Sequence, residues 1–229
     1  MAEMQRSRLL AGAVRVLEEQ GYEHATIAHI TARARVSRRT FYELFPNREQ
    51  CVAAVLRDAA EQVRMELERA DLAGLPWHAQ VRGGLWTILC FLEREPALGR
   101  VLVVHALRGS GPVLAAREEI VAELVALVDA GRSEGARGAG CTTLTAEGVV
   151  GAALAILYSR LARREPRRPQ LTGLLGDLTA TIVLPYLGSA VARREQARAL
   201  PQSANGKQTR HVQPMTAAVD PLWRVCRCA

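Results

Sequence analysis

The sequence predicts an all-α protein with a small N-terminal helix-turn-helix domain of three helices and a larger helical domain behind it. Aromatic residues make up 4% and hydrophobic residues 49% of the 229 residues, so the core must consist mostly of Leu, Val and Ala, which favours helices. Charged residues make up 23%, a balance that supports a packed core rather than disorder. Apolar residues recur at helical spacing, and the sequence shows no internal repeat and no strand-like alternation.

Three short helices are expected in the first part of the chain. Their expected ranges are 6–20, 26–34 and 38–45. Gly21 ends the first helix, Thr26 is the N-cap of the second, and Pro46 stops the third.

A fourth, longer helix follows, because Asn47 and Gln50 form a capping pair at its start. Its apolar stripe consists of Val52, Val55, Leu56, Ala59, Val63 and Leu67. A helix of this length can link the small domain to a second one. The sequence therefore predicts a helix-turn-helix domain in 1–50, a second helical domain in 51–195, and a tail in 196–229 that is disordered or docks through a short segment around Leu222 and Trp223.

The second domain is predicted as five helices separated by Pro- and Gly-containing turns. The expected ranges are 76–93, 97–107, 112–130, 146–163 and 170–194. The loop 131–145 contains four glycines, and Pro185 is expected to kink the last helix.

The third helix has two faces of opposite character when Ser37 is taken as its N-cap and each residue turns the helix by roughly 100°. The inward face consists of Phe41, Leu44 and Phe45, and the outward face of Arg38, Arg39, Tyr42 and Glu43. Each arginine in the first turn loses about 0.3–1 kcal/mol against the helix dipole, and a polyanion would reverse that sign. The pattern predicts a helix-turn-helix whose second helix enters the DNA major groove. A solvated arginine pair is the alternative, because arginine is common throughout this chain.

Residues 6–56 resemble the DNA-binding domain of the TetR family of bacterial transcriptional regulators. The matching residues are Ile27, Ile30, Val36, Ser37, Thr40–Phe45 and Asn47–Glu49. The resemblance implies a set of DNA-contacting residues, namely Thr26, Val36, Ser37, Arg38, Arg39, Thr40, Tyr42 and Arg48. Two positions depart from the family pattern. Arg35 stands where the family usually has Gly, so a non-Gly residue must adopt positive φ, and His29 leaves the capping box from Thr26 incomplete.

The segment from Gly148 to Ser159 is apolar almost all round, and a helix of this kind must be buried on more than one side. A stripe of small residues runs along it, formed by Gly148, Ala152, Ala155 and Ser159. The family resemblance implies a homodimer that pairs through its last two helices and binds a palindromic operator in double-stranded DNA. An ordinary core pair is the alternative for these two helices.

Bulky or polar-tipped side chains interrupt the aliphatic helices of the second domain. The candidates for an apolar effector cavity are Trp86, Leu89, Cys90, His105 and Tyr158. The alternative for each is simple core filling. The expected function is a repressor that a small apolar effector releases from DNA. The rival hypothesis is a ligand-independent architectural or protein-binding factor on the same fold.

The sequence offers no pattern for an enzyme, a metal site or a cofactor. No histidine pair has zinc-binding spacing, no Gly-rich phosphate loop occurs, and a Cys90–His105 pair has no supporting motif. Cys226 and Cys228 lack the second ligand pair of a zinc site.

Charge and apolar runs indicate the compartment and the kind of partner. A net charge of +7 suits a polyanion. The N-terminus has no apolar signal core, and the longest apolar run, 149–158, is too short to span a bilayer, so we expect a cytoplasmic protein without a membrane partner.

Overall fold

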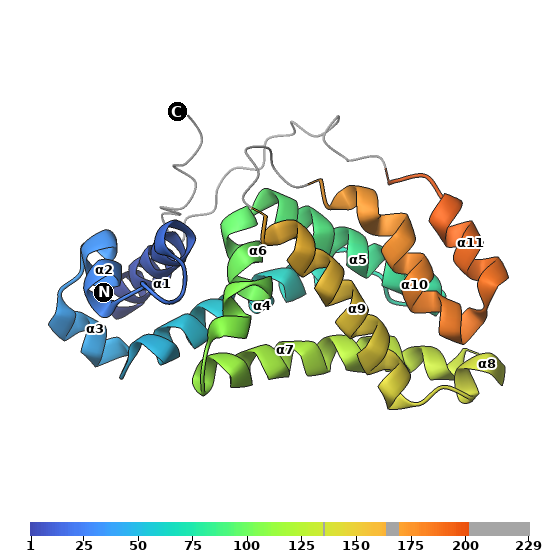
Figure 1. Ribbon diagram of the computed structural model, residues 1–229, viewed down its shortest axis with the longest axis horizontal. Coiled ribbons are helices and arrows are strands. Elements are labelled where there is room, and N and C mark those ends of the chain that lie inside the picture. Colours follow the sequence, from blue (N-terminus) through green and yellow to red (C-terminus); the bar gives the residue numbers. More distant parts are fainter. Residues whose placement is uncertain (135, 164–169, 202–229) are drawn as a thin grey trace.

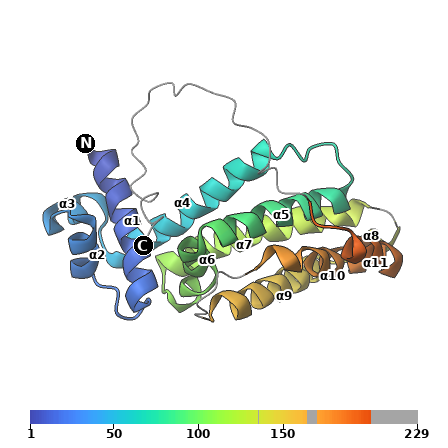
Figure 2. The ribbon, with the colours of Figure 1, turned by 90° about the horizontal axis from the view of Figure 1, so that it is seen from above.

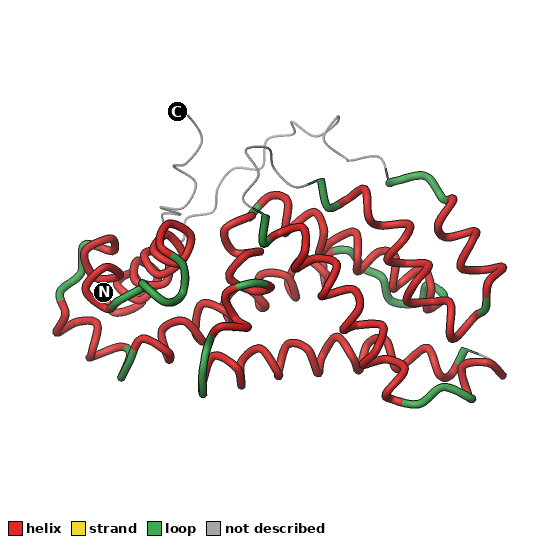
Figure 3. The backbone as a smooth tube through the Cα atoms, in the orientation of Figure 1, coloured by secondary structure: helices red, strands yellow, loops and turns green. Residues whose placement is uncertain are grey.

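The computed structural model describes residues 1–134, 136–163 and 170–201, and every regular element among them is helical. The helices are α1 (Ala2–Gln20), α2 (Ile27–Ala34), α3 (Arg38–Leu44), α4 (Arg48–Arg69), α5 (Trp77–Arg94), α6 (Pro96–Val103), α7 (Pro112–Asp129), α8 (Ala136–Ala139), α9 (Thr143–Leu161), α10 (Leu175–Leu187) and α11 (Ser189–Ala197), with the 3-10 turns η1 (His105–Arg108), η2 (Ala130–Ser133) and η3 (Thr172–Leu174). The predicted all-α class is confirmed. Figure 1 shows α1–α3 at one end of an elongated molecule, with α4 leading into the larger domain, and Figure 3 shows the loops that join the helices.

The three N-terminal helices form where the sequence places them, and they pack closely. α1 begins at Ala2, four residues earlier than expected, because no residue near the terminus breaks a helix and Glu3 lies favourably in its first turn. α1 crosses α2 at Gly12, where an added Cβ would lie 3.0 Å from the Cβ of Ala34. This close approach fixes α2, and through it the position of α3.

The long helix α4 joins the two domains, and the hydrophobic core continues across the junction. The Oδ1 atom of Asn47 accepts a hydrogen bond from the backbone N–H of Gln50 at 2.8 Å, which confirms the predicted cap. One buried cluster includes residues of α1–α4 together with Val101, Ala106, Val113 and Ala116 of the larger domain. An ion pair between Glu18 of α1 and Arg100 of α6 also crosses this junction. The boundary predicted at residue 50 therefore lies within α4, and the hydrophobic core is continuous across it.

Two of the long helices predicted in the second domain are divided. The helix expected over 97–107 ends at Val103 and continues as the 3-10 turn η1. The helix expected over 170–194 consists of η3, α10 and α11. Pro185 lies inside α10, and the break comes at Gly188, whose φ of 82° is readily adopted only by glycine. The expected single helix with a kink at the proline was wrong in this respect.

The region after α7 is more ordered than the sequence indicated. η2 and α8 occupy part of the predicted loop 131–145. α9 begins at Thr143, three residues earlier than expected, because Thr142 and Thr145 form a reciprocal capping box.

The chain beyond α10 is anchored by a buried arginine. The side chain of Arg82 in α5 is 6% exposed and forms an ion pair with Glu195, whose side chain is 7% exposed. Its Nη2 atom donates to the carbonyl oxygens of Arg198 and Ala199 at 2.9 and 3.0 Å. The tail predicted over 196–229 is therefore held against α5 at Arg198 and Ala199. Its remainder, 202–229, including Leu222 and Trp223, lies outside the described residues.

Candidate nucleic-acid interface and effector region

The turn between α2 and α3 is a complete Schellman motif with an arginine at its left-handed position. The backbone N–H of Val36 donates to the carbonyl of Thr31 at 3.1 Å, and that of Arg35 donates to Ala32 at 3.2 Å. Arg35 has φ 54° and ψ 47°, so the predicted positive φ at a non-Gly residue is confirmed. The Nη2 atom of Arg8 in α1 donates to the Arg35 carbonyl at 3.3 Å and so ties the turn to α1.

Ser37 starts α3 and fixes its orientation. Its Oγ atom accepts from the backbone N–H of Thr40 at 3.0 Å and lies 2.9 Å from the Thr40 hydroxyl. Phe41 on the inner face is fully buried and contacts the ring of Phe45 with centroids 5.8 Å apart. Val36 is partly buried and packs against the same core. The hydrophobic face therefore holds α3 in one rotation about its axis.

The outer face of α3 presents the predicted base- and phosphate-contacting side chains to solvent. Arg38 is exposed, and Tyr42 is 57% exposed. The side chain of Arg39 is 90% exposed, and its Nε atom donates to Oε1 of Glu43 at 3.1 Å. The structure brings these residues together on one surface, at the end of the molecule formed by α2 and α3 (Figure 1).

Thr26 and the N-terminus of α2 lie at the same end of the molecule. The Oγ1 atom of Thr26 accepts from the backbone N–H of His29 at 3.2 Å, which is one half of a capping box. The His29 ring instead donates to the carbonyl of His24 at 3.1 Å. The incomplete box predicted from the sequence is therefore what forms.

Arg48 is engaged inside the domain, unlike the other predicted DNA contacts. Its Nη1 atom donates to the carbonyl oxygens of Tyr22 and Ala25 at 3.2 and 2.9 Å. Its Nε and Nη2 atoms donate to Oε1 of Glu49, and the guanidinium lies 4.7 Å from the centroid of the Tyr22 ring. These contacts tie the start of α4 to the loop between α1 and α2. A direct phosphate contact by Arg48 would require breaking some of them.

The five predicted effector residues lie on three elements of the second domain. Leu89 is fully buried, and Trp86 and Tyr158 pack against the same hydrophobic cluster. Cys90 lies beside Leu89 in α5 and is partly exposed, and burial raises the pKa of its thiol. His105 lies in η1 and is 8% exposed.

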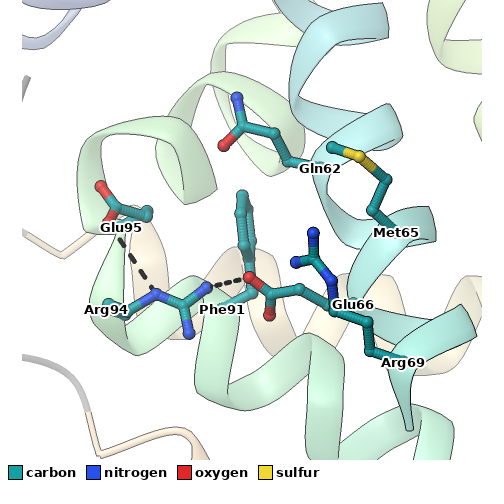
Figure 4. A pocket seen from close by; sticks show the side chains of 7 residues that line it. All are labelled: Gln62, Met65, Glu66, Arg69, Phe91, Arg94 and Glu95. Carbon is teal, nitrogen blue, oxygen red and sulfur yellow. Dashed lines mark hydrogen bonds and ion pairs between the residues drawn. The ribbon is translucent and has the colours of Figure 1, made fainter. Parts of the chain in front are cut away.

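An open pocket lies between α4 and α5, and none of those five residues lines it (Figure 4). Its volume is about 430 Å³, and its walls are Gln62, Met65, Glu66, Arg69, Phe91, Arg94 and Glu95. Arg94 is ion-paired with Glu66 and Glu95 across it. No local sequence pattern distinguishes these residues, because charged side chains on a helix are usually solvated. Only the approach of α4 to α5 places them around one space.

Residues 9–55 match a known family. The model for bacterial regulatory proteins of the tetR family matches residues 9–55, from the buried part of α1 into α4. The N-terminal domain belongs to the tetR family. The TetR resemblance predicted from residues 6–56 is confirmed, and with it the helix-turn-helix assignment, in which α3 is the second, or recognition, helix.

Curated relatives match part of the chain. An uncharacterised HTH-type transcriptional regulator of Mycobacterium tuberculosis is 28% identical over 119 residues, which cover 51% of this chain and 54% of the relative. A homologous regulator of Mycobacterium bovis matches over the same length with the same identity. The chain thus spans about half the length of the curated relatives it matches.

Solved structures match the whole fold at low identity. The transcriptional regulator FadR from Bacillus subtilis, in complex with stearoyl-CoA, superposes with a TM-score of 0.66 at 16% identity, covering 80% of this chain and 98% of FadR. The fatty acid degradation regulator FadR from Bacillus halodurans gives a TM-score of 0.65 at 16% identity, covering 78% and 94%. These neighbours support the same helical architecture behind the TetR-type domain.

Among the described residues, no group of His, Cys, Asp and Glu side chains is placed to hold a metal ion. One described helix, α9, is long and apolar enough to cross a membrane by length and composition alone. The uninterrupted apolar run noted in the sequence, 149–158, is shorter than this helix. In the single chain 28% of its most apolar 18-residue window is buried, and a core helix of a water-soluble protein can meet the same length and composition criteria.

Proposed function

We propose that this TetR-type protein is a sequence-specific, DNA-binding transcriptional regulator, without enzymatic activity, that acts in the cytoplasm. The observation that carries the proposal is the outer face of α3, where Arg38, Arg39 and Tyr42 are exposed while Phe41 is fully buried beneath them. An α-helix anchored in this way fits the major groove and presents its first turn to base edges. Sequencing the duplexes that the protein selects from a random pool tests the proposal, and recovery of no enriched motif would refute it.

The proposed assembly is a homodimer that pairs through α9 and α10. The small residues predicted as a contact stripe, Gly148, Ala152, Ala155 and Ser159, are all exposed in the single chain. A Cβ added at Gly148 or Gly151 would meet no atom of this chain within 4 Å. Leu144 and Leu184 are 72% and 47% exposed. These helices therefore have an uncovered apolar side, which a second copy can cover by close helix packing.

Sedimentation of Ala155→Arg tests this interface. An arginine placed in a close helix contact leaves an unpaired charge and costs about 3–5 kcal/mol of association. Ala73→Arg is the matched control, because Ala73 is exposed in the α4–α5 connection on the other side of the molecule (Figure 2). If Ala155→Arg still forms a dimer, the dimer interface does not include this part of α9.

The proposed regulation is release from DNA by a small effector bound in the second domain. FadR from Bacillus subtilis is described in complex with stearoyl-CoA, so acyl-CoA compounds are the first effectors to test. A compound that binds the DNA-free conformation more tightly than the DNA-bound one must weaken operator binding. It must also raise the melting temperature as its concentration passes Kd.

The rival function is a ligand-independent factor on the same fold. It is favoured by the packing of Leu89, Trp86 and Tyr158 into one hydrophobic cluster, where they act as core residues. Thermal unfolding with and without acyl-CoA, combined with DNA binding under the same conditions, separates the two functions. A melting temperature and an operator affinity that do not respond to any effector would favour the rival.

A further inference from the structure

Arg35 occupies the left-handed position in the turn between α2 and α3, next to the exposed face of α3. Both hydrogen bonds of the Schellman motif depend on positive φ at Arg35, so the fold imposes this conformation whatever the side chain. Glycine adopts it freely, whereas a side chain with a Cβ is strained there. The fold alone therefore favours glycine at position 35.

No contact within the described part of the chain offsets this strain. The hydrogen bond from Arg8 goes to the backbone carbonyl of Arg35, and glycine would accept it equally well. The Arg35 side chain is exposed, and no carboxylate of the residues that the structure describes lies within ion-pair distance of it. Neighbouring Arg33 differs in this respect, because it is paired with Glu19.

The surroundings make the charge at position 35 more unfavourable still. Arg35 lies two residues before the N-cap Ser37 and three before Arg38, which is also exposed without a carboxylate partner among the described residues. Like charges at this spacing repel one another in the free protein, and a polyanion at the same surface reverses the effect.

We propose that Arg35 is a phosphate-contacting residue that adds affinity for the DNA backbone next to the recognition helix. The proposal rests on the proposed DNA-binding function. It adds that the backbone strain at Arg35 in the free protein is retained because the side chain contacts a phosphate in the DNA complex. Backbone strain is commonly kept at functional sites for this reason. A phosphate contact carries no base information, so Arg35 contributes to binding of all sequences.

The decisive variant is Arg35→Gly, for which stability and DNA binding should change in opposite directions. Removal of the strain should raise the melting temperature by about 1–4 °C, after allowing for the larger entropy of the unfolded glycine chain. The logarithm of the affinity falls as the logarithm of the salt concentration rises. Loss of one phosphate contact should make this fall less steep by about 0.9 for each protomer bound. Arg35→Lys keeps the charge and should keep the slope.

Asp71→Gly is the matched control for strain. Asp71 is the other non-Gly residue with positive φ among the described residues, at 46°. It follows α4, whose 22 residues span about 33 Å, several Debye lengths from the turn. Asp71→Gly should also raise the melting temperature, and it should leave the salt slope unchanged.

The binding probe is a labelled random-sequence duplex of roughly 30 base pairs, or three helical turns, titrated across salt concentrations. Arg38→Ala serves as the test of the DNA-binding surface itself. An unchanged slope in Arg35→Gly together with a lowered slope in Arg38→Ala would overturn the role of Arg35 and leave the proposed function standing. Absence of salt-dependent binding by the unmodified protein would instead remove the proposed function. A lower melting temperature in Arg35→Gly would overturn the strain argument.

Discussion

Arg39 is the residue through which the recognition helix is expected to distinguish one base pair from another. It lies in the first turn of α3, opposite the buried Phe41, and its side chain is 90% exposed. An arginine in this position can donate two hydrogen bonds to O6 and N7 of guanine, which contributes about 1–3 kcal/mol of discrimination. Arg39→Ala should therefore remove a preference at one base pair in each half-site.

The structure lowers the expected magnitude slightly. Arg39 is ion-paired with Glu43 one turn later, and this exposed pair must open before the guanidinium reaches a base. Opening it costs about 0.3–0.5 kcal/mol. The remaining discrimination is on the order of 0.5–2.5 kcal/mol, or roughly 2- to 70-fold for each half-site. Glu43→Gln should keep the base preference and bind up to about twofold more tightly, because the guanidinium is already free.

The assay is the affinity of both variants for the selected operator and for each of its single-base substitutions. Arg39→Ala should flatten the profile at one position and leave the others unchanged. Equal weakening on every duplex would show that Arg39 contacts the backbone and that α3 is rotated from the proposed orientation.

Three further predictions concern residues whose environment only the structure shows. Arg48→Ala should lower the free energy of unfolding by about 2–4 kcal/mol, measured in urea, because it removes the hydrogen bonds to the carbonyl groups of Tyr22 and Ala25. A DNA affinity that depends less steeply on salt, without loss of stability, would instead show that Arg48 contacts a phosphate. Arg82→Met should cost about 3–5 kcal/mol and lower the melting temperature by roughly 10 °C, because it removes the buried cation that pairs with Glu195 and leaves that carboxylate to the more exposed Arg198 and His78. An Arg82→Met/Glu195→Leu double variant as unstable as the single one would refute this account. Burial raises the pKa of the Cys51 thiol to about 12 from 9.0, so below pH 9.0 this thiol should resist alkylation until the protein unfolds. Rapid alkylation of the native protein would show that the region around Cys51 opens.

Local sequence signals were sufficient for the N-terminal domain, because its helix ends depend on neighbouring residues. Thr26, Ser37 and Asn47 each accept a backbone hydrogen bond from three residues ahead, as their positions predicted. The inward and outward faces of α3 follow from helical periodicity alone. The caps of these helices and the exposed face of α3 were therefore predictable from the sequence, and the contacts of this face with DNA stay predictions.

Contacts between residues far apart in the chain decided the rest. The sequence predicted that Arg48 contacts DNA, but its donors bond to carbonyl groups more than twenty residues earlier, which no local pattern reveals. The pocket between α4 and α5, the anchoring of the chain end by Arg82, and the core shared by the two domains arise in the same way. The sequence alone determined which residues form helices and which face of each is apolar. Only the tertiary structure decided which partners those faces and charges have, because that depends on how the helices pack together.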